Sequence, residues 1–237
     1  MKKAIIVGAS SGIGHDLAII LSKNDYKVGL LARREKEILN LKATNNEAFE
    51  TAVFDVTAAE IEQKLFEMVS KLEGLDLLII TAGIGDINEN LDIKIDINTI
   101  STNVLGFTKV AVWAFSFFQN QKHGHLVAIS SIAGLRGSKN TTSYNATKAF
   151  QINYLEGLTQ KAVASKLPIY ISDIRAGLVQ TAMAKGDGLF WVCPRDKAAN
   201  QIYKGITAHK KILYVSKRWA IIAYILKMIP NWIYYRL

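Results

Sequence analysis

Cysteine and proline are both scarce in this chain of 237 residues, which has one cysteine and three prolines. The single cysteine, Cys193, excludes an internal disulfide and fits a reducing compartment. No histidine accompanies Cys193 in its Trp-Val-Cys-Pro segment, so we interpret the thiol as a packing group and not as a nucleophile. No linker rich in proline, glycine or serine divides the sequence, which predicts a single domain.

Several classes of function lack their sequence signature. No spacing typical of metal ligands is found among the histidines, so we expect no metal site; they are His15, His123, His125 and His209. No basic groove with aromatic platforms is indicated, which argues against nucleic acid as a partner. The N-terminus runs directly into a predicted strand without room for a signal peptide, so we expect a cytoplasmic protein.

The sequence does contain a regular alternation of apolar strand patterns and helical patterns. Apolar residues make up 50% of the chain, enough for a sizeable core. The strand patterns are continuous apolar runs, which predicts an α/β fold with a doubly wound parallel sheet. The predicted strands are 3–8, 27–31, 50–54, 76–80, 124–130, 168–174 and 212–215, and the predicted helices are 12–24, 34–44, 58–71, 98–119, 143–165 and 196–208.

A glycine-rich turn typical of dinucleotide binding follows the first strand. Gly8, Gly12 and Gly14 form the pattern G-x-x-x-G-x-G between an apolar run and a helical pattern. Glycines let the backbone approach a pyrophosphate closely, and the helix N-terminus offers free N–H groups and a positive dipole end. The alternative is a purely structural tight turn, because the spacing differs from the more familiar G-x-G-x-x-G.

A tyrosine and a lysine lie one helical turn apart further along the chain. Tyr144 and Lys148 fall in a predicted helix, where positions i and i+4 share a face. A free tyrosine has a pKa near ~10, and an adjacent cation would lower it toward the working range of an acid–base catalyst. Ser131, at the end of a predicted strand, could hold a substrate oxygen. Taken alone, Tyr144 and Lys148 could also be a solvated pair on a helix surface.

Five motifs in order give the chain a resemblance to the short-chain dehydrogenase/reductase (SDR) family. They are the glycine motif from Gly8 to Gly14, Ala82-Gly83, Asn103-Val-Leu-Gly106, Ser131 and Tyr144-x-x-x-Lys148. The resemblance covers about residues 3 to 181. It implies a single Rossmann-like domain, a nicotinamide cofactor, hydride transfer between an alcohol and a carbonyl, and a homodimer or homotetramer. The chain departs from the family pattern at Thr81, where the family has Asn, and at Ala176, where it has Pro.

The resemblance also implies a role for each predicted catalytic residue. Ser131 would polarise the substrate oxygen, and Tyr144 would donate or remove its proton. Lys148 would lower the pKa of Tyr144 and hold the nicotinamide ribose. Asn103 would bind a water that links Lys148 to solvent; a hydrogen bond to nearby backbone is the alternative for this residue.

Further residues are expected to contact the cofactor. Ser10 and Ser11 add hydroxyls near the phosphates, Asp55-Val56 resembles the family's adenine contact, and Thr181 matches the position that holds the nicotinamide carboxamide. The full predicted cofactor set is Gly8, Ser10, Ser11, Gly12, Ile13, Gly14, Arg33, Arg34, Asp55, Val56, Ala82, Gly83, Tyr144, Lys148, Gly177, Val179 and Thr181.

The end of the second predicted strand indicates which cofactor is used. A carboxylate there would bind the adenosine ribose of NAD, whereas a cation suits the 2′-phosphate of NADP. The chain has Arg33 and Arg34 at this place and no acid before Glu35. A guanidinium is a planar fork that matches phosphate, so we expect NADP, with Arg33 as the main contact, Arg34 as a second contact and NAD as the alternative cofactor. Both arginines could instead be surface residues at the start of a helix.

The carboxyl end differs in charge from the rest of the chain. Residues 195–237 contain nine Lys or Arg and one acid, whereas residues 1–194 contain 20 basic and 19 acidic residues. The apolar run near the end is interrupted by Lys227 and Pro230, short of the ~20 residues that a membrane-spanning helix needs. We therefore expect a catalytic domain over 1–216 and an extension over 217–237. The extension would pack on the domain, on a partner subunit or peripherally against an anionic inner membrane face.

The segment over about residues 181–195 is expected to be a substrate lid, as in the SDR family. Its apolar residues are Met183, Leu189, Phe190 and Trp191, and its predicted hinges are Gly186 and Gly188. Together with the extension, they favour a lipophilic alcohol or ketone as substrate, although ordinary packing of these side chains against the core is the alternative. The predicted function is an NADP-dependent oxidoreductase. The competing hypothesis is a non-catalytic dinucleotide-binding sensor or scaffold at a membrane surface.

Overall fold

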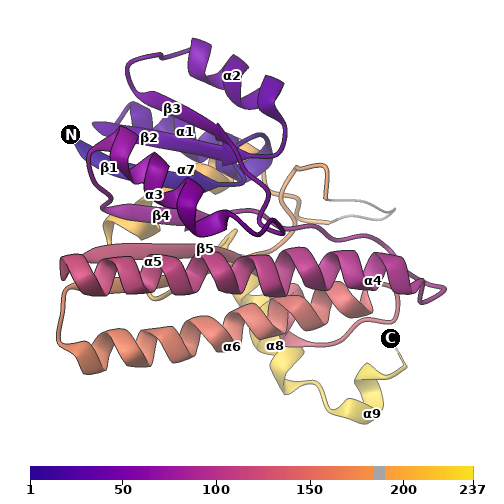
Figure 1. Ribbon diagram of the computed structural model, residues 1–237. Coiled ribbons are helices and arrows are strands. Elements are labelled where there is room, and N and C mark those ends of the chain that lie inside the picture. The colour runs from indigo at the N-terminus through magenta and orange to yellow at the C-terminus, as the bar shows by residue number, and fades with distance from the viewer. Residues whose placement is uncertain (184–189, 237) are drawn as a thin grey trace.

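The structure is a computed structural model that describes residues 1–183 and 190–236. Within these residues the strands are β1 (Lys2–Val7), β2 (Tyr26–Ala32), β3 (Phe49–Val53), β4 (Leu77–Ile80), β5 (Gly124–Ser131), β6 (Ile169–Ala176) and β7 (Ile212–Val215). All are parallel and form one sheet in the order β3-β2-β1-β4-β5-β6-β7 (Figure 1). The seven predicted strands and the single-domain, Rossmann-like doubly wound sheet are thus confirmed.

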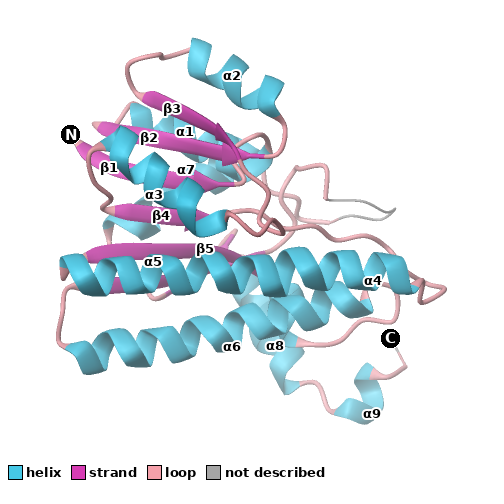
Figure 2. Ribbon diagram, in the orientation of Figure 1, coloured by secondary structure: helices cyan, strands magenta, loops and turns pink. Residues whose placement is uncertain are grey.

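Helices cover both faces of this sheet (Figure 2). Because side chains alternate along a strand, Ile5 and Val7 of β1 enter one apolar core, while Ala4 and Ile6 enter the other. The first core packs against α3 (Ile61–Leu72), α5 (Phe107–Gln121) and α6 (Thr142–Ser165), and the second packs against α1 (Gly12–Ser22), α2 (Glu35–Ala43) and α7 (Arg195–Thr207). The central strands are therefore buried on both sides, as their continuous apolar runs predicted, whereas the edge strands β3 and β7 are partly exposed.

The helix predicted over 98–119 begins earlier and is interrupted. Helix α4 (Ile93–Ile100) begins after Asp92, whose carboxylate accepts a hydrogen bond from the Lys94 amide at 2.9 Å. The prediction missed the first residues of α4, because Ile93, Ile95 and Ile97 alternate with polar residues as in a strand. A π-helical turn, η1 (Ser101–Gly106), then joins α4 to α5 and carries a fully buried Asn103. Such turns recur at functional sites, because they redirect side chains within a helix.

The strand order places a crevice between β1 and β4. From β1 the chain winds outward to β2 and β3, and from β4 it winds the other way to β5, β6 and β7. The loops that leave β1 and β4 therefore separate at the carboxyl ends of these neighbouring strands. In open α/β sheets, this switch point is where ligands bind.

Two short helices that the sequence did not predict follow β7. They are α8 (Trp219–Met228) and α9 (Asn231–Tyr234). Helix α8 contacts β7 and the short 3₁₀ turn η2 (Ile132–Leu135), which follows β5. In Figure 1 both lie below the sheet, with α9 farther from it. Across residues 1–183 and 190–236, no helix is both long and apolar enough to cross a membrane.

Candidate active site

A cleft of about 980 Å³ opens at the carboxyl ends of the central strands. Every predicted catalytic or cofactor-binding residue lines this cleft, except Asn103, which is fully buried behind it. The structure therefore brings together segments that are spread over more than 170 residues of sequence, from Gly8 to Thr181. The predicted roles of these residues stay predictions; what the geometry shows is that they share one cavity.

Two glycines of the turn after β1, Gly8 and Gly14, have no room for a side chain. Gly8 has φ +104°, and a Cβ added to it would lie 2.5 Å from the Ala82 amide nitrogen. A Cβ at Gly14 would lie 2.5 Å from the Gly8 carbonyl oxygen. Gly12 has φ +60°, a left-handed conformation that favours glycine. These glycines let the turn close tightly and leave the N-terminus of α1 facing the cleft, where free amides can hold an anion.

Thr81, one of the two departures from the family pattern, ties this turn to β4. Its hydroxyl lies within hydrogen-bonding distance of two backbone carbonyls, 3.1 Å from Val7 O and 3.0 Å from Gly8 O. A threonine hydroxyl has one proton, so it donates to these acceptors in turn or shares between them. The β1 and β4 ends are thus fixed to each other without the family's asparagine.

The two arginines after β2 both line the cleft, but they lie differently. Arg34 reaches across the glycine turn and donates to Ser10 Oγ at 2.9 Å and to Ser11 Oγ at 2.5 Å. Arg33 lies near Asp55 and contributes to the pKa of that carboxyl. Burial would raise the Asp55 pKa, but hydrogen bonds from the Thr57 amide and hydroxyl and the charge of Arg33 outweigh it, so the pKa lies below its usual value.

These features fit a dinucleotide bearing an additional phosphate. Gly8 and Gly14 let the turn pack closely against Thr81 and Ala82, the start of α1 offers unpaired amides at the cleft, and two guanidinium groups also line it. Gly12 also lies next to Thr181, since a Cβ at Gly12 would be 3.4 Å from Thr181 Cγ2. Thr181 therefore lies against the glycine turn.

Ser131 and Tyr144 form the opposite end of the cleft. Ser131 Oγ donates to Ala176 O at 3.1 Å and accepts from the Ala133 amide at 3.1 Å. Ser131 also lies close enough to the Tyr144 hydroxyl to lower its pKa. Ala176, the second departure from the family pattern, thus contributes a carbonyl that orients Ser131. The segment between Ser131 and Tyr144 is held to α6, because Asn145 Nδ2 donates a hydrogen bond to Arg136 O at 2.8 Å.

Tyr144 is held from above by the loop that follows β4. A Cβ at Gly85 would lie 2.5 Å from the Tyr144 ring, so this position admits only glycine without a shift of the ring. The same loop passes Lys148, because a Cβ at Gly83 would lie 3.6 Å from Lys148 Nζ. Gly85 was not predicted as a site residue; its signal was a second glycine two residues after Ala82-Gly83.

The electrostatics of Tyr144 differ from the expectation. Burial raises the pKa of Tyr144 above its ordinary value of 10.0, and the hydrogen bond with Ser131 offsets part of the rise. Lys148 was expected to lower this pKa, but its ammonium lies 5.7 Å from the tyrosine ring centroid and is turned toward other acceptors. Desolvation of the phenolate therefore outweighs the attraction of the cation in this arrangement.

Lys148 is held by groups that the sequence reasoning missed. Its ammonium donates to Ile129 O at 2.9 Å and to Gln151 Oε1 at 2.9 Å. Gln151 Nε2 in turn donates to the main-chain carbonyl of Asn103 at 2.8 Å. Burial lowers the pKa of Lys148 to about 8, while the negative charge of Asp173 acts in the opposite direction. Gln151 lies three residues after Lys148 on α6, and this i, i+3 spacing was the available signal.

Asn103 takes the backbone alternative that the sequence left open. Its Oδ1 accepts from the Ile84 amide at 2.9 Å, and its Nδ2 donates to Ile84 O at 2.7 Å and to Thr147 Oγ1 at 3.1 Å. The side chain thus clamps the loop after β4 onto α6. The main-chain carbonyl of Asn103 is linked to Lys148 through Gln151.

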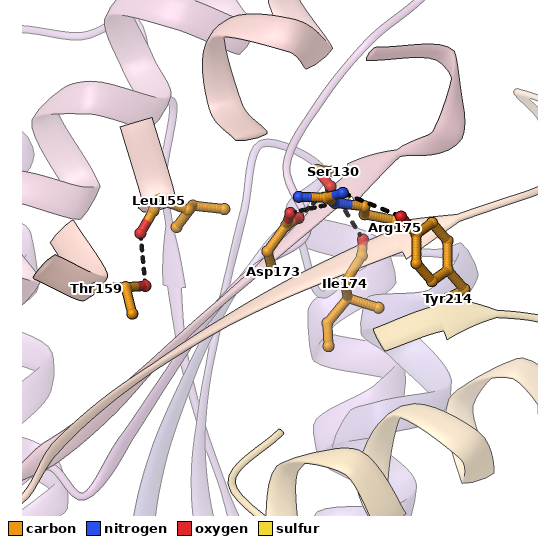
Figure 3. A network of polar contacts seen from close by, with 7 residues as sticks. All are labelled: Ser130, Leu155, Thr159, Asp173, Ile174, Arg175 and Tyr214. Carbon is orange, nitrogen blue, oxygen red and sulfur yellow. Dashed lines mark hydrogen bonds and ion pairs between the residues drawn. The ribbon is translucent and has the colours of Figure 1, made fainter. Parts of the chain in front are cut away.

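A buried ionic network joins β5, β6 and β7 (Figure 3). Asp173 of β6 accepts from Ser130 Oγ and from Arg175 Nε, the latter at 2.6 Å. Arg175 also donates to the Tyr214 hydroxyl at 3.1 Å. Burial raises the pKa of Asp173, although Ser130, Arg175 and Lys148 all favour its charged form. This network was not predicted, because its members are isolated polar residues within apolar strands.

The C-terminal helices close the cleft on the side of η2. Trp219, Leu226 and Tyr234 line the cavity, and Trp219 packs on Gly177 so closely that Gly177 has no space for a side chain. Arg136 donates to Leu226 O at 3.2 Å and to Ile229 O at 3.0 Å. Its guanidinium also lies 4.1 Å from the Tyr234 ring centroid. Arg136 therefore clasps the end of α8 and the start of α9.

The predicted lid is described only in part. Met183 lines the cleft, and the rings of Phe190 and Trp191 lie 5.2 Å and 6.4 Å from the ring of Trp219. Gly186, Gly188 and Leu189 lie outside the described residues. Among the residues that the structure does describe, no cluster of His, Cys, Asp or Glu could hold a metal ion.

Comparisons with known proteins agree with this geometry. A sequence model described as short chain dehydrogenase matches residues 2–188. An uncharacterized oxidoreductase of Staphylococcus aureus (strain MRSA252) is 31% identical over 186 residues, which is 77% of this chain and 80% of that protein. The structure of ElxO with NADP bound has 25% sequence identity and a TM-score of 0.79, and covers 90% of this chain and 96% of that chain.

A second solved structure shows the same fold. It is a short-chain dehydrogenase from Sphingobium yanoikuyae in complex with NADPH, with a TM-score of 0.82 and 21% identity, covering 98% of this chain and 97% of that chain. The sequence match spans most of this chain, including the glycine turn and the Ser131, Tyr144 and Lys148 wall. The chain therefore belongs to the short-chain dehydrogenase family and is an oxidoreductase of the NAD(P)-dependent dehydrogenase/reductase type.

Proposed function

We propose that this protein is an NADP-dependent enzyme that interconverts a lipophilic alcohol and its carbonyl compound. The observation that carries this proposal is that Ser131 and Tyr144 line the cleft together, with Ser131 acting on the pKa of the Tyr144 hydroxyl. This pair lies in the same cleft as the glycine turn and beside the Lys148 ammonium. A substrate oxygen between the two hydroxyls would face whatever cofactor the glycine turn holds.

In this mechanism each protein group moves or holds a proton at a stated atom. Ser131 Oγ, held by Ala176 O and the Ala133 amide, orients the substrate oxygen. Tyr144 Oη donates its proton to that oxygen during reduction and accepts it during oxidation. The raised pKa of Tyr144 keeps the phenol protonated, which suits its role as the acid in reduction. The nicotinamide, when bound, supplies or accepts the hydride.

Lys148 supports this transfer through its position and charge. A ligand beside Tyr144 could also accept a hydrogen bond from the Lys148 ammonium. Gly83 has no side chain that would stand between the ligand and this ammonium. The pKa of about 8 leaves Lys148 largely protonated at neutral pH, so it can stabilise negative charge on the Tyr144 oxygen as the proton leaves.

The arginines after β2 support NADP rather than NAD. Arg34 bridges Ser10 and Ser11 above the glycine turn, and Arg33 stands beside it at the cleft. We assign the 2′-phosphate to both, with Arg34 nearer the turn and Arg33 nearer Asp55. The binding of NADP by ElxO, a protein of 25% sequence identity, is consistent with this choice.

The lining of the substrate end supports a lipophilic substrate. Met183, Trp219 and Leu226 meet there, and Ile84, Ile87 and Ile132 extend the apolar wall. Such a surface favours a carbon-rich alcohol or ketone over a sugar or a small acid. We further propose that the enzyme is a cytoplasmic homodimer or homotetramer, supported by the exposed Ile93 and Ile97 on the outer face of α4.

Two observations weigh against the non-catalytic alternative. Ser131, Tyr144 and Lys148 are all present, and Ser131 and Lys148 are fixed by hydrogen bonds that a passive nucleotide sensor would not require. Gly85 also keeps the Tyr144 ring in place.

Oxidation of NADPH with a panel of hydrophobic ketones and aldehydes tests this function. We expect turnover with NADPH, weaker use of NADH, and a loss of the preference for NADPH in Arg34→Ser. Exposed Arg236→Ser is the matched control and should keep the preference. Tight NADPH binding without turnover across the panel would favour the sensor, and equal use of NADH by the unmodified enzyme would refute the arginine assignment.

A further inference from the structure

Helix α8 is apolar on two faces, and only one of them is buried. Trp219 and Ala223 point into the fold, with 4% and 1% of their surface exposed. The opposite face holds apolar side chains at the i, i+3, i+4 and i+7 positions, each between 47% and 67% exposed. This outer stripe consists of Ile221, Tyr224, Ile225 and Met228.

Further exposed aromatic residues lie near both ends of α8 and α9. Trp232 and Tyr235 are 65% and 78% exposed on and after α9. Phe190 and Trp191 are exposed beside Trp219, where their rings contact the buried face of the same helix. Contiguous apolar surface of this kind marks an interaction site in a folded protein.

The charged residues that neighbour the outer stripe in the sequence all have one sign. Residues 197–237 contain no acid, and Lys217, Arg218, Lys227 and Arg236 are exposed next to the apolar side chains. The Arg218 guanidinium lies 6.0 Å from the Trp191 ring centroid, and the Arg236 guanidinium lies 6.0 Å from that of Trp232. Aromatic rings with cations at their edges are the composition of helices that lie in a membrane interface.

From the stripe and its charges we propose that α8 and α9 dock this enzyme on an anionic phospholipid surface. The apolar side chains enter the boundary between headgroups and acyl chains, and the cations meet the lipid phosphates. A second copy of this chain fits less well. A symmetric contact would place each copy's Lys217, Arg218, Lys227 and Arg236 near the same cations of the other copy.

The benefit of docking rests on the proposed function. The two docking helices also form a wall of the cleft in which the lipophilic substrate would bind. Leu226 and Tyr234 line the cavity from the inner side of the same two helices. Docking of the outer stripe therefore brings the mouth of the cleft to the membrane interface. A lipophilic alcohol or ketone dissolved in the bilayer could then enter without crossing water.

Flotation with lipid vesicles tests the docking surface. The unmodified protein should float with vesicles that contain phosphatidylglycerol and not with vesicles of phosphatidylcholine alone, and salt should weaken the binding. Ile225→Glu should lower vesicle binding more than ~10-fold. The variant places a carboxylate against an anionic surface, where docking would otherwise bury an apolar side chain. Lys227→Gln should lower it about 5-fold, the loss expected for one cation.

Leu39→Glu is the matched control, since Leu39 of α2 is 48% exposed and Ile225 is 47% exposed. It introduces the same charge and should bind vesicles like the unmodified protein. Equal vesicle binding by Ile225→Glu and Leu39→Glu would overturn the proposal. The proposal would also be overturned if the unmodified protein did not bind vesicles and Ile225→Glu had a smaller oligomeric mass. That result would assign the stripe to a contact with a second copy of the chain. Turnover of a water-soluble ketone separates the two claims: vesicle binding without turnover refutes the enzyme, and turnover without vesicle binding refutes the docking surface.

Discussion

The two walls of the cleft are held in different ways. The wall around Tyr144 and Lys148 is fixed by backbone carbonyls, a buried glutamine and glycines that admit no side chain. The wall formed by α8 and α9 is held by aromatic packing on Gly177 and by the hydrogen bonds of Arg136. Chemistry needs atoms placed to within a fraction of an ångström, whereas an apolar substrate wall needs only shape. The first wall is therefore rigid, and the second can differ between relatives.

Tyr144→Phe should have the largest effect on the rigid wall. The ring and its contact with Gly85 remain, but the proton donor is lost, so we expect kcat to fall by ~10²-fold or more. NADPH affinity, measured by fluorescence titration, should change little. A variant with near-normal turnover would remove Tyr144 from the mechanism.

Gln151→Leu tests whether that wall depends on its buried hydrogen bonds. The change leaves the Lys148 ammonium and the Asn103 carbonyl each without one partner, which should cost about 1–3 kcal/mol in unfolding free energy. We expect kcat to fall ~10-fold, with a shifted pH profile because the lysine environment changes. Gln160→Leu, an exposed position on the same helix, should leave stability and kcat unchanged. Equal behaviour of the two variants would show that Gln151 does not position Lys148.

Arg136→Met should affect the second wall and spare the first. Loss of the clasp on Leu226, Ile229 and Tyr234 should loosen α8 and α9. We expect KM for a long-chain ketone to rise several-fold, with a smaller change for a short ketone and little change in kcat. A fall in kcat for both substrates alike would show that the two walls are not independent.

The pH dependence of stability tests the burial of Lys148 in the first wall. Lys148 has a pKa of about 8 in the folded protein and 10.5 as the ordinary value, so between these pH values the unfolded chain binds the additional proton. Unfolding free energy should then rise with pH across this window. Denaturant titrations of Lys148→Met should lack that rise. An identical slope in both proteins would contradict the burial of a charged lysine.

The parts of the fold that repeat local patterns could be predicted from the sequence. All seven strands were, because a strand buried on both faces is a continuous apolar run. The π-helical turn at η1 and the helices α8 and α9 could not. The start of α4 was missed because its isoleucines recur at every second position, as in a strand. Helix α8 has apolar residues on both faces, so its pattern does not indicate which face is buried.

The same distinction holds within the site. Residues of ordered motifs, from Gly8 to Thr181, were placed in one cleft, because each motif follows a strand end and all strand ends meet at one edge. Gln151, Asp173 and Arg136 have no motif. Their partners lie up to 95 residues away in the sequence, and only the folded chain brings them together.

The most direct test of the central claim follows the transferred hydrogen. NADPH carrying deuterium at the reactive carbon of the nicotinamide should be incubated with the enzyme and the best hydrophobic ketone of the panel. Mass spectrometry should find one deuterium on the carbinol carbon of the product, and Tyr144→Phe should form little of it. An alcohol without deuterium, or NADPH that stays bound and unoxidised, would contradict hydride transfer in this cleft.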